Sequence, residues 1–425
     1  MTNKYLILKE KYPKFIFHSF ETKYLNGDLN IIFNFEIYPK LKFRPKVVIK
    51  DLEKKEFSRI EQKYLNTLVF NLGLIEAISY WKATCSPKIE ILCGYLNKDQ
   101  KKWWKDLILN GMGQFFFENQ INFLDKNFLT IQTKSSLKFE PFPKKLNSER
   151  VLIPIGGGKD SIVTLEYFKK LKKDLVLFSL NPKEHHKKII QISKVKEKIF
   201  VERKIDPLLL KLNKKGFLNG HTPFTAYLSF LSILLGVFKN CKFVAFSNEK
   251  SAEEGNVIYL GKVINHQYSK SKEFEEKFRK YTKSYLAKNI EYFSALRNFS
   301  DLEISPLFSQ FKKYFGVFLS CNKALTLKPK KKLKWCGKCP KCLATFASLY
   351  PFLGKKVIQI FKKNLFQDPE LLPIMLQLIG KEKFKPFECV GTIEENKLAF
   401  KLSLERWKKE NKKLPFLLSK FQSIC

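Results

Sequence analysis

Hydrophobic and polar residues follow different periods in different parts of the chain. Leu29–Tyr38 (LNIIFNFEIY) alternates with a period of two, which is typical of a half-buried strand. Leu68–Trp81 repeats its apolar residues with helical spacing. The segment Lys134–Arg150 is polar, contains two prolines and has the composition of a linker. We therefore expect an N-terminal α+β domain over residues 1–147.

From residue 148 onward, short apolar strands alternate with amphipathic helices. The expected strands are Val151–Ile155, Asp174–Leu180, Lys198–Glu202 and Lys242–Phe246, and the expected helices are Asp160–Lys172, Ile189–Lys196 and Pro223–Phe238. This alternation implies parallel strands joined by right-handed crossovers. We predict an α/β fold over residues 148–350, an open and mostly parallel sheet with helices on both faces, in which 270–350 is mostly helical. A helical and loop-rich region is expected over residues 351–425.

The charge balance is strongly basic but ambiguous. Lys and Arg number 79 against 40 Asp and Glu, which gives a net charge of +39. Only 7 of the 79 basic residues are Arg, and 72 are Lys. Nucleic-acid-binding surfaces usually contain more Arg, because its planar guanidinium binds phosphates and base edges in bidentate fashion. Abundant Phe, Lys and Asn are typical of drift towards A/T-rich codons. As the reason for the excess of basic residues, we favour such drift or an anionic small-molecule substrate over nucleic acid. The basic run Lys328–Lys334 does not change this interpretation.

Nothing in the sequence indicates export or membrane insertion. Met1–Phe20 has no apolar run followed by a small-residue cleavage site. The longest apolar stretch, Ala226–Phe238, is shorter than the ~20 residues that a membrane span requires. We expect a cytoplasmic protein whose 9 cysteines are reduced, so that clustered cysteines indicate metal binding or catalysis.

A glycine-rich turn separates the first strand of the α/β region from its helix. Three consecutive glycines, Gly156–Gly158, let backbone N–H groups approach a ligand, and the following helix points its positive end at the same space. A Walker A motif is excluded because Ile153 stands where its first glycine belongs. The dinucleotide pattern fails because Ser161 stands at its last glycine. A tight turn with a capping Asp160 is the alternative to a phosphate site.

The remaining pattern, Gly-Gly-x-Asp-Ser, resembles the loop of the N-type ATP pyrophosphatases, which split ATP into AMP and pyrophosphate. The resemblance implies an adenine nucleotide alpha hydrolase-like sheet, ATP as cofactor, and Asp160 as the ligand of Mg²⁺. The residues expected to bind the nucleotide are Gly156, Gly157, Gly158, Lys159, Ser161 and Asn181. Lys159 and Ser161 are also expected to act in catalysis beside Asp160. This chain departs from the superfamily at Gly156, where a serine hydroxyl is usual.

Two polar stretches follow the last predicted strand, at the edge of the sheet where ligands bind in open parallel sheets. The first begins Ser247-Asn-Glu-Lys-Ser, and the second is Val263-Ile-Asn-His-Gln-Tyr-Ser-Lys-Ser. Glu249 and His266 are candidates for proton transfer, since the ordinary pKa of His lies near operating pH. Glu249 could equally hold a second Mg²⁺. Substrate-binding candidates are Ser247, Asn248, Asn265, Gln267, Lys270 and Arg203, the last as a clamp for a carboxylate. Solvated loops are the alternative for these stretches, and surface exposure for Arg203.

Four cysteines have the spacing of a metal site. Cys336, Cys339 and Cys342 fall within 7 residues, and Cys321 precedes them by 15 positions. Four such thiolates form a closed tetrahedral Zn²⁺ site. A cysteine acid/base pair, an iron–sulfur site and unligated thiols are the alternatives.

Taken together, these motifs and the late Lys385-Pro-Phe-Glu-Cys-Val-Gly-Thr resemble the UDP-N-acetylmuramoyl-L-alanyl-L-glutamate epimerases of peptidoglycan synthesis, over roughly residues 110–395. The resemblance implies ATP-dependent inversion of the terminal L-Glu of UDP-MurNAc-L-Ala-L-Glu. Adenylation of the carboxylate would make the neighbouring Cα proton removable. Cys389 joins Glu249 and His266 as a candidate for the proton transfers.

Three other functions fit part of the pattern. A tRNA-modifying enzyme of the same superfamily would use the same loop, but the chain is poor in Arg and has no recognisable RNA-binding appendage. An enzyme similar to 7-cyano-7-deazaguanine synthase would share the cysteine spacing. A non-catalytic nucleotide-binding scaffold would keep Gly156–Gly158 without requiring Asp160 and Ser161.

Overall fold

The computed structural model describes residues 4–325, 334–410 and 413–425. The described part contains an 11-stranded mixed sheet in the order β13-β10-β7-β8-β9-β4-β2-β1-β5-β6, with β3 paired to β2. Its strands are β1 (Lys14–Leu25), β2 (Asp28–Tyr38), β3 (Leu41–Phe43), β4 (Lys46–Ile49), β5 (Lys88–Ile91), β6 (Thr130–Thr133), β7 (Asn147–Pro154), β8 (Asp174–Leu180), β9 (Glu197–Lys204), β10 (Cys241–Phe246) and β13 (Glu291–Ser294). The hairpin β11 (Val257–Tyr259) and β12 (Lys262–Ile264) stands apart from it.

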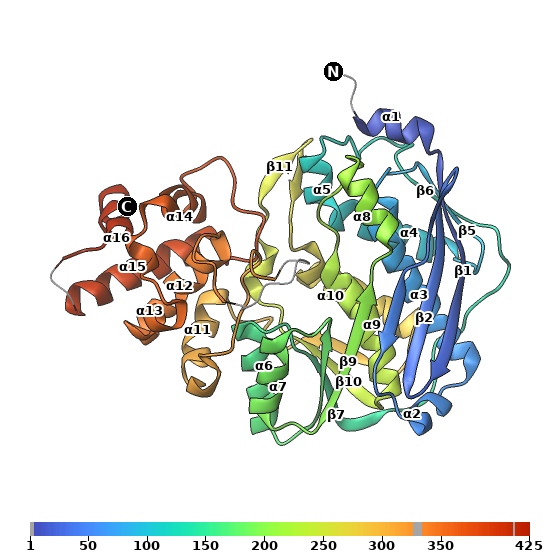
Figure 1. Cartoon of the computed structure of the whole chain (residues 1–425), viewed down its shortest axis with the longest axis horizontal. Coiled ribbons are helices and arrows are strands. Elements are labelled where there is room, and N and C mark those ends of the chain that lie inside the picture. Colours follow the sequence, from blue (N-terminus) through green and yellow to red (C-terminus); the bar gives the residue numbers. More distant parts are fainter. Residues whose placement is uncertain (1–3, 326–333, 411–412) are drawn as a thin grey trace.

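Helices lie along both faces of the sheet and at one side of it (Figure 1). The longer helices of the sheet region are α1 (Lys4–Lys11), α3 (Gln62–Trp81), α4 (Lys98–Gly111), α6 (Lys159–Lys170), α7 (Glu184–Ser193), α8 (Pro207–Lys214), α9 (Phe224–Phe238) and α10 (Lys272–Tyr285). The short ones are α2 (Lys54–Ser58) and α5 (Gly113–Glu118). No helix in the described ranges is both long and apolar enough to cross a membrane.

The C-terminal part is helical and lies on the opposite side of the molecule from β1 and β2 (Figure 1). It consists of α11 (Asp301–Ser309), α12 (Pro340–Leu353), α13 (Lys356–Phe361), α14 (Leu372–Leu378), α15 (Ile393–Glu410) and α16 (Phe416–Ile424). Helix α12 packs against both α11 and α15. The predicted α/β fold with a mostly parallel sheet and a helical C-terminal part is therefore confirmed.

The strands of the parallel segment are buried on both faces because their residues alternate between two cores. In β7, Val151 and Ile153 belong to a core shared with α6 and the C-terminal helices. Leu152, between them, belongs to the core of α3, α9 and the N-terminal strands. Such two-sided burial explains why the sequence of this strand is continuously apolar and does not alternate.

The sequence placed most elements within a few residues. The strand over Asp174–Leu180 is confirmed without change, while the helix expected over Ile189–Lys196 begins earlier, at Glu184, and ends at Ser193. It ends there because Lys194 adopts a left-handed conformation with a φ of 61°. The linker expected over Lys134–Arg150 ends earlier, at residue 146, because β7 begins at Asn147.

Two strand pairings were missing from the sequence analysis. Strand β13 pairs in parallel with β10 inside the region expected to be mostly helical. Strand β4 pairs antiparallel with β9, so the N-terminal strands and the parallel strands form one sheet. The domain borders at residues 147 and 350, and the nucleotide-hydrolase type of sheet, stay predictions. The basic run Lys328–Lys334 lies outside the described residues except for Lys334.

Candidate active site at the glycine loop

The glycine loop connects β7 to α6 at the carboxyl end of the parallel strands. Gly157 has a φ of +85°, and a Cβ atom there would lie 2.6 Å from the His185 ring, so the position requires glycine. Gly158 is the N-cap of α6 and supplies no capping side chain. A Cβ on Gly156 would meet no atom within 4 Å. The loop thus presents backbone N–H groups and open space at the positive end of a helix.

Lys159, the first residue of α6, is buried between two carboxylates. Its Nζ donates to Oδ1 of Asp160 at 2.8 Å and to Oδ1 of Asp301 at 3.0 Å. Burial opposes the charge of this ammonium group, but Asp160 and Asp301 outweigh that effect and raise the pKa of Lys159. The side chain of Asp160 is 24% exposed, and its second carboxylate oxygen receives no hydrogen bond within the described ranges. One face of Asp160 therefore remains available to a ligand.

Asp301 joins the glycine loop to the C-terminal helices. It begins α11, and its backbone N–H donates to Oγ of Ser251 at 2.8 Å and to Oε2 of Glu395 at 3.1 Å. Burial favours the neutral acid, but Lys159 and Lys341 hold the pKa of Asp301 below its usual value. A charged Asp301 thus fixes Lys159 from the side opposite Asp160.

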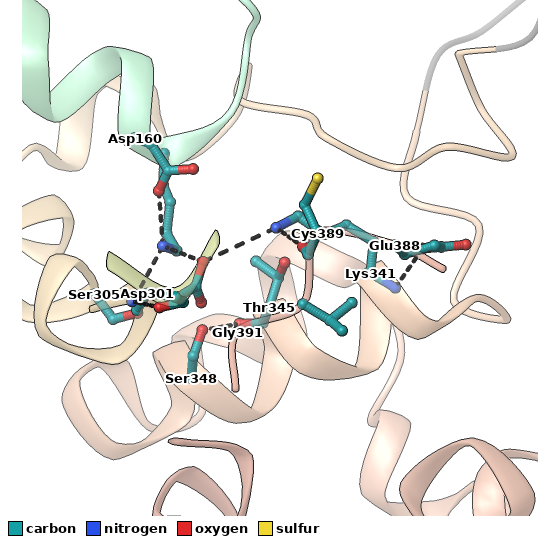
Figure 2. A network of polar contacts seen from close by, with 12 residues as sticks. Asp160, Asp301, Ser305, Lys341, Thr345, Ser348, Glu388, Cys389 and Gly391 are labelled. Carbon is teal, nitrogen blue, oxygen red and sulfur yellow. Dashed lines mark hydrogen bonds and ion pairs between the residues drawn. The ribbon is translucent and has the colours of Figure 1, made fainter. Parts of the chain in front are cut away.

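Lys341, in the first turn of α12, extends the cluster towards Cys389 (Figure 2). Its Nζ lies 4.0 Å from Oδ1 of Asp301 and donates to the carbonyl oxygen of Cys389. Its backbone N–H donates to Oε2 of Glu388 at 2.9 Å. The sulfur of Cys389 points away from Asp301 in this view. Lys341 therefore fixes the backbone of the loop that carries Cys389 while leaving its thiol free for other contacts.

Lys270 lies at the centre of the predicted residues. Its Nζ donates to Sγ of Cys389 at 3.2 Å. Burial opposes the charge of Lys270, but Cys389, Glu249 and Asp160 raise its pKa. Glu249 is itself buried, 3% exposed, just beyond the carboxyl end of β10. The structure thus brings together the glycine loop, Glu249, Lys270 and Cys389.

His266 is neutral and lies in the same neighbourhood. Burial and the charge of Lys270 lower its pKa to about 4. Its Nδ1 lies 2.5 Å from Oε1 of Gln114, an oxygen that can only accept, so Nδ1 carries the proton and Nε2 keeps its lone pair. The rings of His221 and His266 have centroids 4.5 Å apart. Nε2 of His266 can therefore accept a proton, but its lowered pKa makes it a weaker base than the ordinary histidine on which the sequence analysis relied.

Several predicted binding residues are engaged in local contacts. Nδ2 of Asn265 donates to the carbonyl of Ala252, Nδ2 of Asn248 donates to Oγ of Ser294, Oγ of Ser161 donates to the carbonyl of Gly158, and Oδ1 of Asn181 accepts from the backbone of Arg203. By contrast, Oγ of Ser247 and Oε1 of Gln267 are buried and have no hydrogen-bond partner in the described part of the chain. Buried polar atoms without a partner are uncommon, so these two are candidates for ligand contacts, and the binding roles stay predictions.

Arg203 is held inside the protein by a second ion pair. Its guanidinium donates in bidentate fashion to Glu76 at 2.7 and 3.0 Å and to Oγ of Ser79 at 2.7 Å. It also stacks over the ring of Tyr227. A substrate carboxylate would have to compete with Glu76 for this side chain, so the predicted clamp stays a prediction that the local contacts do not favour.

The four predicted cysteines meet at one point. The sulfur atoms of Cys321, Cys336, Cys339 and Cys342 all lie within 4.8 Å of one another. Close pairs are Cys339–Cys342 at 3.5 Å, Cys336–Cys342 at 3.7 Å and Cys321–Cys339 at 3.9 Å. This arrangement matches the donor set of a thiolate metal site.

The sequence analysis missed part of the buried polar network. The additional residues are Ser251, Asp301, Lys341, Glu388 and Glu395. Lys341 was marked only by its place between two cysteines, and Asp301 only by the Ser-Asp-Leu-Glu start of a helix. Neither signal indicates that the side chain points into a site.

Comparison with known proteins identifies two matching family models. The MurL N-terminal domain matches residues 7–295, and the MurL C-terminal domain matches residues 317–421. Three curated relatives all carry the name UDP-N-acetyl-alpha-D-muramoyl-L-alanyl-L-glutamate epimerase. The Micromonospora sp. protein is 34% identical over 79% of this chain and 74% of its own length. The Salinispora tropica protein is 33% identical (78% and 72%), and the Xanthomonas oryzae pv. oryzae protein 30% identical (80% and 75%).

Proposed function

This chain belongs to the MurL family of UDP-N-acetyl-alpha-D-muramoyl-L-alanyl-L-glutamate epimerases, and we propose that it inverts the terminal L-Glu of UDP-MurNAc-L-Ala-L-Glu to D-Glu in peptidoglycan synthesis. We further propose that the reaction consumes ATP and releases AMP and pyrophosphate. ATP would supply the adenylyl group that neutralises the glutamate carboxylate and would release pyrophosphate, so that the carbonyl can accept the charge left when the Cα proton departs. After a proton returns on the opposite face, water would hydrolyse the acyl-AMP to the carboxylate and AMP.

One observation carries the proposal: the thiol of Cys389, a candidate for proton transfer, contacts Lys270, whose charge interacts with Asp160 at the glycine loop. Sγ of Cys389 is 3.2 Å from Nζ of Lys270, and Lys270 is close enough to Asp160 for the two charges to interact. A thiol next to a lysine is the arrangement found at reactive cysteines. An epimerase that activates its substrate with ATP needs these two functions within one substrate length of each other.

The glycine loop is suited to the pyrophosphate end of ATP. Backbone N–H groups of Gly157 and Gly158 and the start of α6 would bind phosphate oxygens. The free oxygen of Asp160 fits the preference of Mg²⁺ for carboxylate ligands. Lys159 keeps its ammonium group buried behind Asp160, where it orients that carboxylate. Ser247 and Gln267 offer unpaired polar atoms to the rest of the substrate.

Proton transfer needs one group that accepts the Cα proton and one that returns a proton on the other face. Cys389, His266 and Glu249 are the candidates that the fold gathers around Lys270. His266 is neutral at pH 7 and has a lone pair at Nε2, so it can act as a base. Lys270 would position the Cys389 thiol and balance negative charge that develops on the substrate.

The proposal is tested by incubating the protein with ATP, Mg²⁺ and UDP-MurNAc-L-Ala-L-Glu, followed by chiral analysis of the released glutamate and quantification of AMP. We expect D-Glu and AMP to appear together, and neither without ATP. D-Glu formation that is independent of ATP would remove the adenylation step but retain the epimerase. Modification of tRNA or of a deazaguanine precursor, with no D-Glu, would overturn the proposal.

A further inference from the structure

We propose that Cys321, Cys336, Cys339 and Cys342 bind one structural Zn²⁺ that holds the glycine loop and Lys341 in their positions in the active site. The metal part of this inference is independent of the proposed function. Its consequence for nucleotide binding rests on that function.

The sulfur geometry indicates a single ion. Thiolates bound to Zn²⁺ at about 2.3 Å in a tetrahedron lie about 3.8 Å apart. The three close pairs at 3.5, 3.7 and 3.9 Å scatter around that distance. An iron–sulfur cluster divides its thiolates among two or more irons, whereas all four sulfur atoms here lie within 4.8 Å of one another, as thiolates on one ion do. Because all four ligands come from the protein, the site is closed and has no position for a substrate, which is typical of structural zinc.

The backbone around the cysteines has the form of a metal-binding turn. Gly337 has a φ of +68°, and the backbone N–H of Lys338 donates to Sγ of Cys336 at 3.4 Å. Cys339 is the N-cap of α12, so its sulfur lies at the positive end of that helix. Both features stabilise negative charge on sulfur, as metal-bound thiolates require.

The segment that leads to Cys321 contacts the glycine loop. The backbone N–H of Leu319, two residues before Cys321, donates to the carbonyl of Gly157 at 2.8 Å. A Cβ on Gly158 would lie 3.3 Å from Cβ of Ser320. The segment that ends at Cys321 therefore supports the glycine loop from outside.

The turn that carries the other three cysteines also carries Lys341, a residue of the charged cluster. Lys341 lies between Cys339 and Cys342 in the first turn of α12, and it contacts Asp301 and the backbone of Cys389. An ion that joins Cys321 to this turn would fix both sides of the candidate active site with respect to each other. The ion would add to the contacts that Asp301 and Lys159 and the shared hydrophobic core already provide between these segments.

The first test is metal analysis of the full-length wild-type protein, purified under reducing conditions without added metal. We expect about one Zn²⁺ per chain, released when a mercurial reagent titrates the thiols. Cys321→Ser and Cys336→Ser should lose the metal, Cys336→His should keep it because His also binds Zn²⁺, and Cys425→Ser, at an exposed thiol, should change nothing. Protein free of metal, or iron in its place, would overturn the zinc assignment even if a Ser variant fails to fold.

The second test measures whether loss of the metal weakens nucleotide binding at the glycine loop. Removing Zn²⁺ should lower the melting temperature by ~5 °C or more and weaken binding of a non-hydrolysable ATP analogue at least about tenfold, because the competent loop conformation becomes less populated. Unchanged binding in metal-free, folded protein would overturn the coupling. Absence of ATP binding in the zinc-loaded wild type would instead count against the proposed function, while the metal result stands.

Discussion

Two buried ion pairs, Arg203–Glu76 between β9 and α3 and Lys159–Asp301 between α6 and α11, differ in how completely their charges are satisfied. Both Glu76 oxygens receive a hydrogen bond from Arg203, which also donates to Oγ of Ser79 and lies over the ring of Tyr227. Lys159 instead divides its ammonium group between Asp301 and Asp160. Asp160 keeps one oxygen towards solvent.

The difference distinguishes a scaffold from a site. A buried charge costs several kcal/mol unless it is paired, and Glu76, with both carboxylate oxygens bonded to Arg203, is paired in this way. The Arg203 pair fastens β9 to α3 in this way. The Lys159 cluster holds an incompletely bonded carboxylate at the start of a helix, and it is surrounded by Lys341 and Lys270, as a site for a phosphate and a metal ion requires. Substitutions in the two pairs should therefore affect different properties.

The largest effect is expected at Asp160. Asp160→Asn keeps the shape of the side chain but removes the charge that would hold Mg²⁺, so AMP formation should fall roughly 10²–10³-fold or more. Asp160→Ala should abolish AMP release. Both should be measured by chromatography of AMP, with circular dichroism to confirm the fold. Turnover at the wild-type rate in either variant would remove the pyrophosphatase function from the glycine loop.

The proton transfer step should be separable from nucleotide chemistry. Cys389→Ser and His266→Gln should each slow exchange of the glutamate Cα hydrogen with deuterated water by roughly 10²-fold if the residue is an acid or base, while AMP formation declines far less. Mass spectrometry of the product measures the exchange. Cys93→Ser is the matched control at a half-buried thiol outside the cluster. Normal exchange in one variant would clear that residue of the role.

Breaking the Arg203 pair should change stability more than activity. Arg203→Met leaves Glu76 buried without its partner and should lower the free energy of unfolding by about 3–5 kcal/mol. Urea denaturation measures this loss. Lys188→Met, which removes the exposed pair with Glu184, is the control and should leave the free energy of unfolding nearly unchanged. A stable Arg203→Met protein with a strongly raised KM for the dipeptide would show that Arg203 binds substrate.

The smallest effect concerns acid stability. The pKa of His266 is about 4 in the folded state against 6.5 for an ordinary histidine, so the unfolded chain binds more protons between these values. The part of the stability that depends on a neutral His266 is therefore fully present above pH 6.5 and falls as the pH drops towards 4, by up to about 1.4 kcal/mol per pH unit. His266→Gln should flatten this decline in melting temperature between pH 7 and 5. An equal slope in both proteins would contradict the buried neutral His266.

Local sequence signals predicted elements whose pattern depends only on their own residues. Strand β8 was placed without error because its apolar run is bounded by polar residues on both sides. The 4-residue strand β13 was missed because it is too short to show a period, and only its pairing with β10 stabilises it as a strand. The β4–β9 pairing joins segments about 150 residues apart along the chain, and no local pattern reports such a contact.

The sequence by itself determined the glycine turn, the cysteine spacing and the alternation of strands and helices, because backbone freedom, ligand spacing and burial period are written in neighbouring residues. It also supplied Asp160, Glu249, Lys270 and Cys389 as separate candidates. Only the tertiary structure decided that Lys270 joins them, that Asp301 fixes Lys159, and that Arg203 is already bonded to Glu76. These are contacts between distant segments, and their strength depends on burial, which a linear pattern of charged residues does not reveal.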